Sequence, residues 1–293
     1  MPVGASNPAW VRSTIGTRQR HLAVGVLKHR RPCDAFFIAR PTDGAFCASE
    51  SLRRLRRARD SLTGRVNFER RGATVSGSAK LNDLPDWIYI LRDSYDFYRR
   101  LSAGGSPKIR SHQRNVRERI NRVLKSNAEV QFSDPQDRPV TRHLTRALDN
   151  GRMERHAPFI RSLEAVRGTL VWQYGYEKVP RGLENKYAYA ELVGPNGPVL
   201  TDDIILGLVL FAPGCTYPAH AHDGITESYI CLSGAVSEND QGVYAPGSLI
   251  FNPPEQLHRI TVADSNPALL FYAWEGSAEK LRHQKMVFSR KSR

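Results

Sequence analysis

Short apolar segments separated by turn residues fill the C-terminal part of the chain, from Leu170 to Gly276. β-Branched and aromatic residues dominate each segment, and Gly, Pro, Asn or Asp divides it from the next. Short strands with such turns are typical of an antiparallel sandwich or barrel. The expected strands lie in GTLVWQYGYEKV, KYAYAELVGPNGPVL, DIILGLVLFAPG, ESYICLSGAV, GSLIFNPP and HRITVADSNPALLFYAWEG. We therefore predict a closed or double-sheet β-domain over residues 169–276.

A helical pattern precedes the strands. In LPDWIYILRDSYDFYRRL, residues 84–101, apolar side chains recur at three- and four-residue steps, as on one face of a helix. The pattern returns in SHQRNVRERINRVLKSN, where we expect Ser111 to cap the helix. A third helical stretch is expected from about Val140 into the 160s. The predicted fold class is α+β, with a helical region over residues 76–168 that packs on the C-terminal antiparallel β-barrel.

Basic residues are concentrated at the two ends of the chain. The formal net charge is +14, but residues 1–75 hold 15 Lys+Arg against 5 Asp+Glu, and residues 276–293 hold 6 against 1. Neither end shows the spacing of a nucleic-acid-binding motif, so we expect no nucleic-acid partner. We interpret residues 1–75 as a disordered arm or an extension that the working domain does not need. Residues 1–33 lack acids, which also fits a transit peptide, and residues 277–293 form a basic tail.

The cellular setting is predicted from what the sequence lacks. No segment is long and apolar enough for a secretory signal or a membrane span. The cysteines Cys33, Cys47, Cys215 and Cys231 show neither CxxC spacing nor a dense disulfide pattern, which favours a reducing compartment. We therefore expect a cytoplasmic protein without a membrane partner, and a homodimer as the usual state of such a chain.

A candidate metal site lies in GCTYPAHAHDGITESYICLSG, residues 214–234. Alternate residues of a strand share a face, so His220 and His222 point the same way, and Glu227 shares a face with Tyr229. We expect DGIT to be the turn of a hairpin that brings the two imidazoles and the carboxylate together, and His258 offers a third imidazole. Three nitrogens and one oxygen suit Zn, Fe, Mn, Co or Ni, so we predict a divalent transition metal.

The spacing of these residues resembles the first cupin motif. Five residues separate Gly214 from His220, one separates His220 from His222, four precede Glu227, and six more precede Gly234. A pair of nearby histidines is weak evidence alone, but the whole string with both glycines is specific. The resemblance implies that the barrel is a cupin, or jelly roll, and that it holds a metal.

The second cupin motif is only partly kept. Pro253 and His258 stand at the expected separation, whereas Glu255 occupies the position of a glycine and Val262 that of an asparagine. We expect these departures to alter turn details more than metal ligation.

The stretch from about Leu170 to Gly276 is similar to the L-type branch of the cupin dimethylsulfoniopropionate (DMSP) lyases. It shares Tyr229 two residues after the glutamate, Tyr217 three residues before the first histidine, and the PALLFYAWEG ending. This family cleaves DMSP to dimethyl sulfide and acrylate. The resemblance implies that the three histidines and the glutamate are metal ligands, that Tyr229 is the catalytic base, and that Tyr217 is a second active-site tyrosine.

The chemistry of this elimination agrees with the residue types. A base must take a proton from the carbon next to the substrate carboxylate, and a metal that holds the carboxylate stabilises the developing charge. A cation close to Tyr229 favours the phenolate of a side chain whose pKa is ordinarily about 10. Aromatic faces bind methylated cations well. The candidates to hold the sulfonium are Tyr187, Tyr189 and Trp274, with Trp172, Phe251 and Tyr272 as further candidates.

Other interpretations stay open at this point. Another metal-dependent cupin enzyme, a dioxygenase or isomerase, would keep the ligands without needing Tyr229. A non-enzymatic cupin would bind a small ligand and report it through its basic N-terminal region, with salt-dependent DNA binding. The aromatic candidates also fit plain barrel core, and Cys215 and Cys231 fit buried spectators. No role is assigned to the remaining histidines, His21, His29, His112, His143, His156 and His283.

Overall fold

The computed structural model describes residues 79–176, 178–284 and 286–288. These residues belong to one structural unit, Ala73–Arg293. The extension predicted over residues 1–75 lies outside the described residues. Within the described part, no helix is long and apolar enough to cross a membrane.

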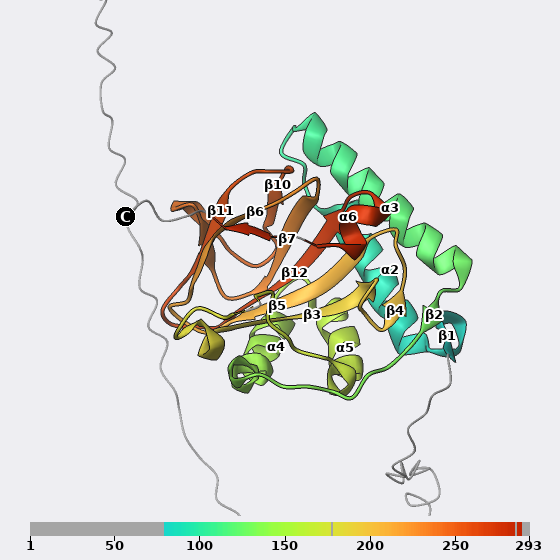
Figure 1. Cartoon of the computed structure of the whole chain (residues 1–293), viewed down its shortest axis with the longest axis horizontal. Helices are drawn as coiled ribbons and strands as arrows, with labels where there is room; N and C mark the ends of the chain where they lie inside the picture. The colour runs from blue at the N-terminus through green and yellow to red at the C-terminus, as the bar shows by residue number, and fades with distance from the viewer. Residues whose placement is uncertain (1–78, 177, 285, 289–293) are drawn as a thin grey trace, which may run out of the picture. The chain divides into compact units, whose positions relative to one another are not determined.

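Two β-sheets form the barrel, and the larger sheet also includes two short strands from the preceding helical region (Figure 1). In spatial order, the eight-stranded sheet contains β1 (Ala79–Lys80), β2 (Glu129–Val130), β4 (Val199–Leu200), β3 (Tyr187–Gly194), β5 (Ile205–Phe211), β12 (Ala268–Glu275), β7 (Thr226–Ser233) and β10 (Leu249–Asn252). The five-stranded sheet contains β13 (Met286–Phe288), β6 (Thr216–His222), β11 (His258–Val262), β8 (Val236–Glu238) and β9 (Gln241–Tyr244). Antiparallel pairing predominates among these strands, and β3 with β4 is parallel. The predicted α+β fold with an antiparallel cupin barrel is confirmed.

Helices cover the larger sheet on its outer side, and Figure 1 shows α4 and α5 beneath β3 and β5. The α-helices are α2 (Pro85–Arg100), α3 (Pro107–Ser126), α4 (Leu144–Arg152), α5 (Ala157–Val166) and the short α6 (Ala278–Arg282). The 3-10 helices are η1 (Leu81–Asp83), η2 (Pro139–His143), η3 (Arg167–Thr169) and η4 (Leu183–Asn185).

The larger sheet is buried on both faces, which divides the interior into two cores. Leu206 and Leu208 of β5 pack in the outer core with the helices, whereas Val209 and Phe211 pack in the inner core between the sheets. A strand covered on both faces has a continuous apolar sequence, and β5 reads ILGLVLF. The inner core is where the motif histidines lie, so the site is enclosed by both sheets.

Three local predictions need correction. Helix α3 begins at Pro107, and its cap is Ser106, whose hydroxyl accepts a hydrogen bond from the backbone N–H of Ile109 at 3.3 Å. The choice of Ser111 was wrong, because a proline at the first helical position marks the start. The third helical stretch is two helices, α4 and α5, separated by residues 153–156. In place of the strand expected in residues 168–179, the described residues of this segment make isolated bridges at Val171 and Gln173.

Strand β13 adds an edge to the smaller sheet that the sequence pattern did not indicate. It pairs antiparallel with β6, with Met286 opposite His222 and Phe288 opposite His220. Part of the basic segment 277–293 therefore contributes to the sheet that carries the motif histidines. A strand of three residues is too short to show a period of its own.

Gly234, the last glycine of the cupin motif, should tolerate no side chain. Its φ is +79°, and a Cβ would lie 2.4 Å from the carbonyl oxygen of Pro267 and 2.9 Å from the Cα of Ala268. Both are backbone atoms, which cannot rotate away. We expect Gly234→Ala to lower the free energy of unfolding by about 2–4 kcal/mol in chemical denaturation. Gly168→Ala, where nothing lies within 4 Å of the new Cβ, is the matched control, and equal losses in the two variants would contradict this explanation.

Candidate metal centre

The four motif residues come from two facing sheets. His220 and His222 lie on β6, and His258 is directly opposite His220 on the neighbouring β11 of the smaller sheet. Glu227 lies on β7 of the larger sheet, which pairs with β12 and β10 rather than with β6. The hairpin predicted at DGIT was therefore wrong. The turn instead carries the chain from one sheet to the other, and strand alternation still places both sets of side chains in the space between the sheets.

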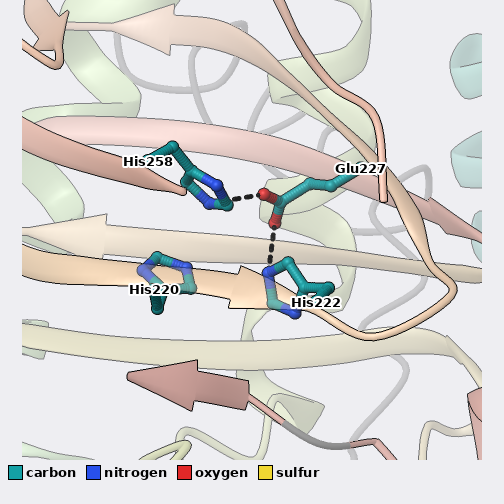
Figure 2. A group of neighbouring side chains, drawn as sticks. All are labelled: His220, His222, Glu227 and His258. Carbon is teal, nitrogen blue, oxygen red and sulfur yellow. Dashed lines mark ion pairs between the residues drawn. The ribbon is translucent and has the colours of Figure 1, made fainter. Parts of the chain in front are cut away.

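The side chains of the four residues point toward one another (Figure 2). One potential ligand atom from each lies within 4.8 Å of all the others. Nε2 of His258 is 2.9 Å from Oε2 of Glu227, and Nε2 of His222 is 3.6 Å from Oε1. None of the four residues is more than 3% exposed. Bonds of about 2.1 Å in a tetrahedral site place the ligand atoms about 3.4 Å apart, so the cluster has the dimensions of a single-metal site.

Backbone carbonyls orient two of the imidazoles. Nδ1 of His220 lies 2.9 Å from the carbonyl oxygen of Pro218, and Nδ1 of His258 lies 3.0 Å from that of Gln256. A carbonyl only accepts, so both Nδ1 atoms carry a proton, and in the neutral form of each ring Nε2 presents a lone pair. Nε2 of His258 and Nε2 of His222 are buried and face the Glu227 carboxylate. Imidazole nitrogens and carboxylate oxygens that converge in a buried cluster fit a bound cation.

The charge of the cluster also suits a divalent ion. Burial, together with the neighbouring His258, lowers the pKa of His220 to about 3, so this imidazole is neutral. Burial opposes the charge of Glu227, but His222 and His258 outweigh it and hold the pKa of the carboxyl well below its usual range. Burial likewise opposes the charge of His258, and Glu227 outweighs it and raises the pKa of that imidazole. A divalent ion would take the place of the proton that His258 shares with Glu227. With the single negative charge of Glu227, the ion would leave one net positive charge for an anionic ligand.

Cross-strand neighbours hold the Glu227 carboxylate in place. Asn252 on β10 and Trp274 on β12 are the residues directly opposite Glu227 in the sheet. The indole N–H of Trp274 donates to Oε1 at 2.7 Å, and the amide of Asn252 donates to Oε2 at 3.4 Å. One donor for each oxygen fixes the rotation of the carboxylate before a metal arrives.

Trp274→Phe should weaken metal binding while leaving the aromatic wall nearly intact. The variant removes the N–H that orients Glu227, and loss of such a support typically reduces metal affinity about 10- to 100-fold. The dissociation constant for Zn²⁺, measured by competition with a chromophoric chelator, tests this. Trp87→Phe, in a buried tryptophan of α2, is the control and should leave the constant unchanged. Equal affinities in both variants would contradict a supporting role.

An aromatic cavity of about 360 Å³ opens onto the cluster. Its wall includes His220, His222 and Glu227 together with Tyr174, Tyr176, Tyr187, Tyr189, Tyr217, Tyr229, Tyr272 and Trp274. Tyr217 reaches it because a bulge in β6 inserts an extra residue between Tyr217 and His220, which brings both to the same face. The Tyr217 hydroxyl donates to that of Tyr187 at 3.2 Å, and its ring lies against His220.

The aromatic residues singled out in the sequence divide into two groups. Tyr187, Tyr189, Trp274 and Tyr272 line the cavity. Trp172 instead packs in the outer core, and Phe251 lies against His112, with ring centroids 5.2 Å apart. Cys215 and Cys231 are buried thiols, and burial raises their pKa to about 11 and about 12, respectively. This agrees with the expectation that the cysteines are spectators.

Glu255, which replaces the glycine of the second cupin motif, fits its position for local structural reasons. Its φ is +61°, the left-handed conformation for which the cupin motif uses glycine. Its carboxylate accepts a hydrogen bond from the backbone N–H of Gly224 at 2.8 Å, and its own N–H donates to the carbonyl of His222 at 3.0 Å. Glu255 thus connects the loop before His258 to the turn between the sheets, and ligand placement survives the loss of the glycine.

Comparison with known proteins gives a consistent result. The sequence model of the dimethylsulfoniopropionate lyase family matches residues 112–270. A protein of Cereibacter sphaeroides provisionally named dimethylsulfoniopropionate lyase DddL is 50% identical over 210 residues, which cover 72% of this chain and 90% of the relative. The chain belongs to the DMSP lyase family.

Two solved DMSP lyase structures share the fold of this family member. The crystal structure of DddQ from Ruegeria pomeroyi DSS-3 has a TM-score of 0.54 at 18% identity, covering 71% of this chain and 98% of that one. A chain from the crystal structures of the DMSP lyases RdDddP and RnDddQII has a TM-score of 0.52 at 21% identity, covering 70% and 98%. At these identities the likeness establishes the architecture, with helices before the barrel.

One buried network of this DMSP lyase family member was missed in the sequence. Nε2 of His112 on α3 lies 2.8 Å from the hydroxyl of Ser228, and Nδ1 lies 3.0 Å from Glu275. The Tyr98 hydroxyl on α2 also lies 2.8 Å from Ser228. Ser228 separates Glu227 from Tyr229 and faces the helices, so the network fixes β7 from its outer side. No spacing signal could find it, because His112 and Ser228 are 116 residues apart.

Proposed function

We propose that the protein cleaves DMSP to dimethyl sulfide and acrylate, with Tyr229 as the base and a divalent metal held by His220, His222, Glu227 and His258. The observation that carries the proposal is the position of Tyr229 at the aromatic cavity, beside the candidate metal ligands. Tyr229 and Glu227 lie two residues apart on β7, so their side chains share the face of the strand that is turned toward the cavity. Family membership supports the choice of substrate.

The metal, when bound, would supply positive charge that holds the substrate carboxylate and favours the Tyr229 phenolate. Without the metal, the surroundings of Tyr229 disfavour its phenolate. Burial and the charge of Glu227 raise the pKa of Tyr229 well above its usual value. The hydroxyl is therefore protonated in the metal-free protein at neutral pH, which explains why a buried tyrosine would act as a base only in the metal-loaded protein.

The elimination itself requires little else from the protein. Tyr229 takes a proton from the carbon next to the carboxylate, the bonding electrons form the double bond of acrylate, and the carbon–sulfur bond breaks with its electrons leaving on sulfur. Dimethyl sulfide departs as a neutral molecule, so no acid is needed for the leaving group. Tyr217, which packs on His220, is proposed to shape the cavity beside the ligands.

Aromatic side chains are proposed to receive the sulfonium. Tyr187, Tyr189 and Trp274 line the cavity with their rings, and the faces of such rings attract methylated cations. A cavity of about 360 Å³ lies at the lower end of the range of small-molecule sites, which suits a compact zwitterion.

Headspace gas chromatography tests the proposed function directly. The full-length protein is loaded in turn with Zn²⁺, Mn²⁺, Fe²⁺, Co²⁺ and Ni²⁺, incubated with DMSP, and assayed for dimethyl sulfide. Release with at least one metal is expected, and the absence of release with all five would overturn the proposal.

The homodimer and the cytoplasmic location stay predictions from the sequence. Sedimentation analysis of the purified protein tests the first, and cell fractionation tests the second.

A further inference from the structure

A buried carboxylate lies behind the cavity wall and has no role in the proposed metal site. Glu191 on β3 is only 4% exposed. Among the described residues, it forms no ion pair with a Lys, Arg or His side chain. A buried charge without a counter-charge is costly in a protein, and it commonly marks a place where a charged ligand completes the balance.

The hydrogen bonds around Glu191 are those of an ionised carboxylate. The backbone N–H of Asn196 donates to Oε1 at 2.9 Å, and the side-chain amide of Gln284 donates to Oε2 at 3.3 Å. One donor to each oxygen suits a group that only accepts, whereas a protonated carboxyl would need an acceptor for its own hydrogen. Burial nevertheless raises the pKa of Glu191, so these donors compensate its charge only in part.

Glu191 belongs to the same row of the sheet as the proposed base. The register places Glu191 opposite Gly207, Gly207 opposite Tyr272, and Tyr272 opposite Tyr229. Strands lie about 4.8 Å apart, so three spacings, about 14 Å, separate the backbones of Glu191 and Tyr229. Both residues belong to the inner side of the larger sheet, at opposite ends of this row.

Gly207, between Glu191 and Tyr272 in this row, leaves room for the Tyr272 ring. A Cβ at this position would lie 2.4 Å from both Cζ and the hydroxyl of Tyr272. The Tyr272 ring therefore lies over Gly207, toward the strand that carries Glu191. Burial raises the pKa of Tyr272 well above its usual value, and the charge of Glu191 is the second cause of this rise. Tyr272 is part of the cavity wall, so its ring connects that wall with the neighbourhood of Glu191.

Gln284 connects the carboxylate to the cavity itself. It is part of the cavity wall, and its amide N–H donates to Glu191. The carboxylate therefore lies one hydrogen bond behind a residue of the cavity wall. The aromatic wall and the carboxylate behind it both favour positive charge at this end of the cavity.

We propose that Glu191, acting through Gln284 and Tyr272, makes this end of the cavity a cation-selective pole that recognises the positively charged group of a zwitterionic substrate whose carboxylate lies at the metal centre. This rests on the proposed function for the carboxylate end and extends it to specificity. Glu191 is a positioning residue, since it does not itself line the cavity. Neutral thioethers and simple fatty acids of the same size would be discriminated against at this pole.

The test compares two ligands that differ in charge alone. β-Alanine betaine carries a trimethylammonium group two carbons from its carboxylate, and its carbon isostere carries a tert-butyl group in the same place. Calorimetric titration of Zn²⁺-loaded, full-length protein gives a dissociation constant for each. The wild-type protein should prefer the betaine at least about tenfold, and Glu191→Gln should lower the ratio by about tenfold, the effect of one charge about 12 Å away at an effective dielectric constant of about 20.

Two further variants separate charge from structure. Glu164→Gln removes a largely buried carboxylate on the outer helix α5 and should keep the wild-type ratio. The double variant Glu191→Gln/Gln284→Glu returns a carboxylate to this end of the cavity and should restore the preference for the betaine. This result is expected even if Glu191→Gln alone fails to fold.

The outcomes that overturn the proposal are specific. An unchanged ratio in a folded Glu191→Gln variant, an exchange variant without preference, equal binding of both ligands to the wild type, or no binding of either would each do so. A loss of folding alone would weaken both ligands together and leave the ratio unchanged. The binding measurement needs no turnover, so failure of the lyase proposal would appear separately, as betaine binding without release of dimethyl sulfide from DMSP.

Discussion

Tyr229→Phe is expected to reduce the release of dimethyl sulfide from DMSP by about a hundredfold to ten-thousandfold, which is the usual contribution of general acid–base catalysis. The variant removes one oxygen atom and keeps the ring in the inner core, where Tyr229 packs between the sheets. Metal content, measured by plasma mass spectrometry, should equal that of the wild type, because the four proposed ligands are untouched. The Michaelis constant should change far less than the turnover number.

Tyr244→Phe is the matched control for this experiment. Tyr244 lies on β9, the edge strand of the smaller sheet farthest from β6, and is partly exposed. Its variant should therefore keep wild-type turnover. Wild-type activity in Tyr229→Phe would show that the base is elsewhere. Tyr217 would then be the next candidate, because it lies in the same wall of the cavity.

His258→Ala should abolish most metal binding and, with it, activity. A four-ligand zinc site contributes about 10–16 kcal/mol of binding free energy, so one ligand accounts for about 3 kcal/mol, or a loss of at least about a hundredfold in affinity. The variant also removes the imidazole that lies 2.9 Å from Glu227. The dissociation constant for Zn²⁺ and the turnover of DMSP at saturating metal are the two measurements.

His283→Ala controls for the loss of an imidazole. His283 is exposed and follows α6, so we expect wild-type affinity and turnover. If His258→Ala binds Zn²⁺ as tightly as His283→Ala does, His258 is not a ligand, whatever its position in the cluster.

The sequence predicted the candidate ligands more successfully than it predicted their connections. Alternation along a strand shows which side chains share a face, and this was enough to group His220 with His222 and Glu227 with Tyr229. It does not show which strands pair. The same alternation is compatible with a hairpin and with a turn between two sheets, and the structure has the second. The ligands still meet, because facing sheets direct inward side chains toward a shared space.

Contacts between distant parts of the chain account for what the sequence did not predict. Trp274 was predicted from the sequence to hold the sulfonium, yet its N–H also orients Glu227, which follows from the register of β12 on β7. Gln284 reaches the cavity because β13 pairs with β6, and a three-residue strand has no detectable period. The cap of α3 was the exception, since Ser106 followed by Pro107 is a local signal that could have been used.

The direct test of the account is the identity and ratio of the products. Proton NMR of DMSP incubated with the metal-loaded protein should show acrylate, with dimethyl sulfide released in equal amount, and protein stripped with a chelator should give neither until a divalent metal is restored. Elimination by a metal-dependent base predicts this result. Formation of a hydroxypropionate in place of acrylate, or undiminished activity in the stripped protein, would contradict it.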